Sequence, residues 1–83
     1  MKIDDLKDKS IKCIKISGGF EIKYPDLKPI EAAPIFKDKI IRVIDVTDRY
    51  IIAVGLMFYG TIKVKKSDLK EHFVLADTDE PIE

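Results

Sequence analysis

The chain has 83 residues, and its 15 basic and 15 acidic residues leave no net charge at pH 7, unlike the strongly basic balance of a dedicated DNA-binding domain. This length allows only one hydrophobic core, so we expect a single domain over residues 1–83. Hydrophobic residues make up 46% of the chain, an ordinary globular fraction that argues against disorder.

The only cysteine and the start of the chain bear on cellular location. Cys13 has no second cysteine with which to form a disulfide within the chain. Residues 1–10 are charged and lack the apolar segment of a signal peptide. The longest apolar run, residues 50–59, is too short to cross a bilayer. We therefore expect a cytoplasmic protein that does not enter a membrane.

Two strands and a tight turn are expected near the start of the chain. Residues 9–16, KSIKCIKI, combine isoleucine with lysine and predict a strand rather than a helix. Gly18 and Gly19 can adopt the positive φ angles of a hairpin turn. Residues 20–24, FEIKY, then alternate apolar and charged side chains, as a half-buried strand does.

A proline-rich segment follows at residues 25–38, where three prolines fall within ten positions. Each proline removes an amide donor, so the segment predicts a long loop rather than a helix or a central strand. Ile35 and Phe36 are too apolar to extend into water, and we expect the loop to pack against the sheet as a compact lid.

The middle of the chain predicts a hairpin of two long strands. Residues 39–46, KIIRVIDV, are rich in β-branched side chains, and residues 47–49 are typical of a turn. The second strand opens the uncharged run of residues 50–59, in which apolar side chains occupy both alternating positions. We therefore expect this strand to be covered on both faces or to bend at Gly55.

The C-terminal part predicts a strand, a short helical turn and a closing strand. Residues 60–66, GTIKVKK, alternate again. Ser67 is suited to cap the start of a helix, and residues 67–72 have room for one or two turns. Residues 73–75, FVL, then return to a strand, and an acidic tail follows over residues 77–83.

This order of elements resembles the SH3-like small β-barrels, which combine about five short strands with a long loop and one short helical turn, of 3-10 type, before the last strand. The closest likeness lies in residues 60–76, GTIKVKKSDLKEHFVLA, with Asp68 and Leu69 in the turn. The resemblance covers roughly residues 6–76 and implies a mostly β fold. An Sm-like barrel is the alternative fold. Unrelated functions share this fold, so the resemblance implies no particular one.

The chain departs from the SH3 domains that bind proline-rich peptides. Those domains share an ALYDY-like stretch and a tryptophan in the binding groove, and this chain has no tryptophan. Because aromatic walls hold such ligands, we do not expect proline-rich peptides to bind here.

A catalytic centre, a metal site and a cofactor are not expected. Cys13 and His72 are the only thiol and imidazole, and they would form an activated thiolate if the first and last strands brought them together. Cys13, however, lies in an apolar strand, where a free cysteine acts as a small hydrophobic residue. One histidine and one cysteine also fall short of a zinc site. We therefore expect no enzyme and no small-molecule substrate.

An aromatic hairpin tip is the first candidate binding surface. Phe58 and Tyr59 end the uncharged run, where exposed rings would suit a protein contact. Ile35 and Phe36 of the proline-rich loop are the other candidate contact residues. These features favour a small binding or adaptor module that contacts a protein partner or associates with its own copy.

A strip of lysines is the second candidate surface. If the strand over residues 9–16 neighboured the strand over residues 60–66, five lysines on the predicted outer faces would form one strip: Lys12, Lys15, Lys63, Lys65 and Lys66. Such a strip would bind nucleic-acid phosphates with a strong dependence on salt. Lysines on exposed strands equally serve to prevent edge-to-edge pairing. A nucleic-acid-binding barrel is therefore the alternative function.

Overall fold

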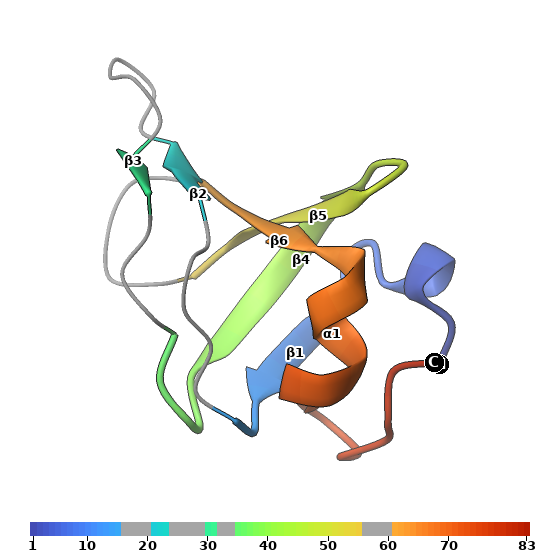
Figure 1. Ribbon diagram of the computed structural model, residues 1–83. Helices are drawn as coiled ribbons and strands as arrows, with labels where there is room; N and C mark the ends of the chain where they lie inside the picture. The colour runs from blue at the N-terminus through green and yellow to red at the C-terminus, as the bar shows by residue number, and fades with distance from the viewer. Residues whose placement is uncertain (16–20, 24–29, 32–34, 56–60) are drawn as a thin grey trace.

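The computed structural model describes residues 1–15, 21–23, 30–31, 35–55 and 61–83 (Figure 1). Its elements in chain order are the 3-10 turn η1 (Ile3–Asp5), β1 (Ser10–Cys13), β2 (Glu21–Lys23), β3 (Ile30–Glu31), β4 (Ile40–Val46), β5 (Tyr50–Val54), β6 (Thr61–Lys65), α1 (Lys66–His72) and β7 (Phe73–Leu75). The mostly β fold expected from the sequence is confirmed.

The described strands pair antiparallel in one sheet, in the order β3-β2-β6-β5-β4-β1-β7. The hairpin of β4 and β5 continues into β6, whereas β1 lies between β4 and β7. Within the described residues, β3 and β7 are the two edges and do not pair with each other. The observed sheet is therefore open, and its closure into a barrel is a proposal.

Strand alternation determines which residues form the core. In β1, β5 and β6, every second side chain is buried and the intervening ones are at least partly exposed. The buried hydrophobic residues form one cluster: Leu6, Ile11, Cys13, Ile35, Ile41, Val43, Ile51, Ala53, Ile62, Val64, Leu69, Phe73, Leu75 and Ile82. Period-2 alternation thus supplies one face of the sheet to a single core.

The element before the last strand is an α-helix and not the expected 3-10 turn. Helix α1 spans seven residues, more than 3-10 geometry usually sustains. Leu69 is the buried residue of the helix, and Phe73, which is extended and begins β7, is buried as well. Lys65 is the N-cap, so Ser67 lies inside the first turn rather than capping it. No helix in the described residues has the length and apolar character to cross a membrane.

Strand β5 is buried on one face and ends at Gly55. Ile51 and Ala53 are fully buried, whereas Tyr50 and Val54 on the other face are partly exposed. Gly55 has a φ of 115°, a conformation that favours glycine. The regular strand therefore stops at Val54, just before the glycine, and only one face of β5 is fully buried.

The C-terminal tail packs against the sheet. Ile82 is 1% exposed and belongs to the core, and Pro81 forms an antiparallel bridge with Val74 of β7. The amide of Glu83 donates to the carbonyl of Met1 at 2.9 Å, and the Met1 ammonium donates to the carbonyl of Pro81 at 3.1 Å. The two ends of the chain consequently lie side by side (Figure 1).

Candidate functional site

The structure describes only part of the predicted aromatic surface. Phe58 and Tyr59 fall in residues 56–60, outside the described residues. Ile35 is 1% exposed and belongs to the core, so it is not free to contact a partner. Phe36, the next residue, is 55% exposed. Of the predicted contact residues that the structure describes, Phe36 alone is accessible.

Phe36 belongs to a group of exposed apolar residues that we call the apolar end: Ile14, Phe36 and Ile40. Ile14 is 39% and Ile40 is 52% exposed. The three residues come from the end of β1, from the segment before β4 and from the start of β4, and backbone hydrogen bonds connect these parts of the chain. The Cys13 amide donates to the carbonyl of Lys39 at 2.8 Å, and the Lys39 amide donates to the carbonyl of Phe36 at 3.2 Å.

The predicted single strip of lysines does not form, because β4 and β5 separate β1 from β6 in the sheet. Lys12, on β1, donates to Asp79 Oδ1 at 2.6 Å. This hydrogen bond and the charge of Asp79 raise the pKa of Lys12 above its ordinary value. Lys15 donates to Glu71 Oε1 at 2.6 Å. Both lysines near β1 are therefore paired with acids.

Lys65 of β6 and Lys66 of α1 lie instead beside the turn between β4 and β5, in what we call the basic pocket. This pocket has a volume of about 450 Å³ and is lined by Arg49, Tyr50, Lys65, Lys66 and Ser67. The Lys66 amide donates to the carbonyl of Arg49 at 2.9 Å, which joins the start of α1 to the turn. The pocket thus gathers three positive side chains from segments that are distant in sequence.

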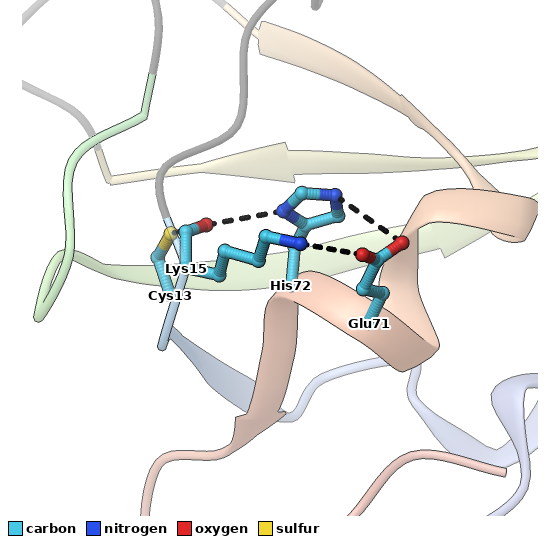
Figure 2. Close-up of polar contacts among 4 residues, drawn as sticks. All are labelled: Cys13, Lys15, Glu71 and His72. Carbon is cyan, nitrogen blue, oxygen red and sulfur yellow. Dashed lines mark hydrogen bonds and ion pairs between the residues drawn. The ribbon is translucent and has the colours of Figure 1, made fainter.

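Cys13 and His72 meet at one backbone carbonyl (Figure 2). Pairing of β1 with β7 brings them to the same end of the sheet, where Cys13 is the register partner of Phe73. The thiol of Cys13 donates to the carbonyl of Lys15 at 3.0 Å, and His72 Nδ1 lies 3.2 Å from the same oxygen. A carbonyl oxygen only accepts hydrogen bonds, so Nδ1 carries the proton in this contact.

The electrostatics of this group oppose nucleophilic chemistry. Burial raises the pKa of the Cys13 thiol above its ordinary value of 9.0, and Asp38 adds to this rise. A reactive cysteine requires the opposite shift. Glu71 is held near His72, with Oε2 3.9 Å from Nε2, and its pKa is lowered by the hydrogen bond and the charge of Lys15. The arrangement therefore joins β1 to α1 rather than activating the thiol.

We predict that Cys13 reacts with iodoacetamide much more slowly in the folded protein than in urea. The thiol is buried, and its raised pKa keeps it protonated at neutral pH. The same shift predicts a pH dependence of stability. The contribution of Cys13 to the free energy of unfolding is constant below about pH 9.0 and declines as the pH rises through the folded-state pKa.

The pH dependence is measured by urea titrations followed by far-UV circular dichroism, with Cys13→Ala as the control. The control keeps a small apolar side chain and lacks the titrating thiol. Rapid alkylation of the folded protein, or an unchanged alkaline slope in the control, would contradict this prediction.

Metal binding has no geometric basis in the described part of the chain. No three His, Cys, Asp or Glu side chains gather there in a way that would hold a metal ion. His72 has an acid beside it in Glu71, but its Nδ1 is engaged with a backbone carbonyl. The candidate surfaces are thus the apolar end and the basic pocket.

Comparisons with known proteins leave the choice between these surfaces to their geometry. No match to this chain was found among protein-family models, curated proteins or solved structures.

Sequence reasoning did not single out Ile40 or Arg49. For Ile40 a signal existed, because adjacent isoleucines at positions 40 and 41 cannot both face the core of a half-buried strand. For Arg49 there was none beyond its charge. Its position beside Lys66 depends on the pairing of β5 with β6 and on the helix that follows.

Proposed function

We propose that the protein is a small, non-enzymatic, cytoplasmic binding module that docks through its apolar end on a second copy of itself or on another protein. We further propose that its sheet closes as an SH3-like barrel. Two observations support this fold: the pairing of β1 with β7, and the position of α1 immediately before β7. The free thiol of Cys13 supports a cytoplasmic location, because the cytoplasm keeps thiols reduced.

The exposure of the apolar end is the observation that carries the function. Phe36 and Ile40 are large apolar side chains, and each is more than half exposed to water instead of being packed in the core. Single exposed apolar residues are common, but a group of them is typical of an interaction site. Covering them with a partner would remove this apolar area from water.

Charge favours a second copy as the occupant. The chain has no net charge, so two copies do not repel each other strongly. Lys37, Asp38 and Lys39 are exposed and alternate in sign between Phe36 and Ile40. In a two-fold symmetric contact, the lysines of one copy can approach Asp38 of the other. The apolar end is thus suited to self-association.

We predict that sedimentation velocity at increasing protein concentration will detect a dimer that Phe36→Ser and Ile40→Ser each weaken. The control is Ile44→Ser, since Ile44 is also an exposed isoleucine of β4 but lies outside the apolar end. Ile44 has no partner in β5, because the register shifts between Val43 and Asp45.

A chain that stays monomeric at every concentration would remove self-association. Docking on another protein is then tested by a photo-crosslinking amino acid placed at position 40 or 44 in living cells. A single adduct at position 40 with none at position 44 supports a protein partner. Equal labelling at both positions, or none, would overturn the proposal.

The alternative expectation, a nucleic-acid-binding barrel with one continuous strip of lysines, has less support. Two strands separate the lysines, and Lys12 and Lys15 are paired with Asp79 and Glu71. Positive charge is concentrated locally instead, at the basic pocket.

A further inference from the structure

The basic pocket is built by backbone pairing and does not depend on the apolar end. Thr47 fixes the turn between β4 and β5, since its amide and hydroxyl donate to the carbonyl of Tyr50 at 2.8 and 3.1 Å. Tyr50 is the register partner of Lys65 on β6. The Lys66 amide then binds the carbonyl of Arg49. These bonds place the five lining residues independently of any ligand.

The charge of the pocket is largely uncompensated. In the described part of the chain, Arg49 and Lys65 take part in no ion pair, and Lys66 is paired only with Asp4 at 3.4 Å. The Asp4 side chain is 86% exposed, and at that distance its contact with Lys66 is long for a charge-assisted hydrogen bond. Like charges held close together repel each other, so an anion bound among them would be stabilised.

An aromatic ring borders the same site. The Lys63 ammonium lies 4.1 Å from the centroid of the Tyr50 ring, which is a cation–π contact. This contact holds a fourth cation beside the pocket and restricts the ring that lines it. The site therefore combines a guanidinium, ammonium groups, a serine hydroxyl and a phenol.

We propose that the basic pocket binds a phosphate group, with Arg49 and Lys65 as its charged ligands and Ser67 as a hydroxyl donor. A guanidinium matches phosphate oxygens with two parallel hydrogen bonds, and lysines add point charges. Several cations around one small volume suit the double negative charge of a phosphate better than the single charge of a carboxylate. A mononucleotide presents a phosphate monoester with this double charge, whereas the backbone of a nucleic-acid strand presents a row of phosphodiesters with one negative charge each.

The test is a titration of the full chain, followed by two-dimensional ¹H–¹⁵N NMR at low salt. The probes are inorganic phosphate, adenosine monophosphate and a single-stranded oligothymidylate. We expect the amide signals of Arg49, Lys65 and Ser67 to shift with the phosphate probes, and the shifts to diminish as salt is added. Tighter binding of the oligonucleotide identifies a nucleic-acid strand as the source, and equal binding identifies a small phosphate ester.

The decisive variant is Arg49→Gln combined with Lys65→Gln, which we expect to weaken binding at least about tenfold. The matched control is Lys7→Gln combined with Lys9→Gln. It also removes two positive charges, and both side chains are exposed and belong to neither the basic pocket nor the apolar end. Binding by the control should change by less than about twofold, because solvent screens exposed charges that do not line the pocket.

The proposal is overturned if the amides of the pocket do not shift, or if the control weakens binding as much as the pocket variant. The second result would mean that the chain attracts phosphate only by its general charge. Neither result bears on self-association, since the apolar end and the basic pocket lie at opposite ends of β4.

Discussion

Replacing Ile82 with alanine is expected to lower the free energy of unfolding by about 2–5 kcal/mol, the usual cost of truncating a buried isoleucine. The side chain is 1% exposed and lies in the core cluster, although it is the penultimate residue of the chain. A domain of this length has a total stability of about 4–12 kcal/mol. The substitution therefore removes a large share of the stability.

Urea denaturation followed by far-UV circular dichroism measures this effect. Ile82→Val is a milder variant that should cost about 0.5–1.5 kcal/mol and keeps the test informative if the alanine variant does not fold. Glu80→Ala is the control, because Glu80 is exposed and uses only its backbone in hydrogen bonds. Equal stability of Ile82→Ala and Glu80→Ala would contradict the packed position of the tail.

Replacing Gly55 with alanine is expected to cost about 1–3 kcal/mol, the range for a non-glycine residue in an unfavourable backbone conformation. The φ of 115° at Gly55 is one that L-amino acids rarely adopt. Space is not the limiting factor, since an added Cβ would meet its nearest neighbours, the Ile40 carbonyl oxygen and Ile41 Cα, at 3.5 Å. The cost thus comes from the backbone.

The same denaturation assay tests this prediction, and chemical synthesis supplies a sharp control. D-alanine at position 55 adds a methyl group of the same size but favours positive φ. We expect the D-alanine variant to be more stable than the L-alanine variant. Equal losses from both would show that the methyl group, and not the backbone, determines the cost.

Local patterns predicted the helix position and every described strand except β3, which lies within the segment predicted as a long loop. The β-branched run over residues 39–46 became β4, Ile40–Val46, and the alternating run over residues 60–66 became β6, Thr61–Lys65. The 3-10 type of this turn was implied by the resemblance to SH3-like barrels and was wrong, and Ser67 as the predicted N-cap placed the start of the helix too late. The strand predicted over residues 9–16 was too long: within the described residues 9–15 it covers Ser10–Cys13, and Ile14 is exposed.

The candidate sites were less accessible to sequence reasoning. Ile82 lies in an acidic segment, between Pro81 and Glu83, which is a composition typical of a solvated tail. Its burial follows from the open edge of β7, where Pro81 pairs with Val74. The basic pocket required the turn before β5 to meet the end of β6. No local pattern encodes such a meeting, because it joins residues separated in the chain.

The sequence by itself determined which side chains of each strand share a face, because successive residues of a strand point to opposite sides. The sequence also determined that the net charge is zero and that the single cysteine forms no disulfide within the chain. Only the tertiary structure decided which strands are neighbours. That order separated Lys12 from Lys63, buried Ile35 beside Cys13, and brought Arg49 to Lys66. Strand order depends on long-range pairing and on the shared core, and the period of a single strand carries no information about either.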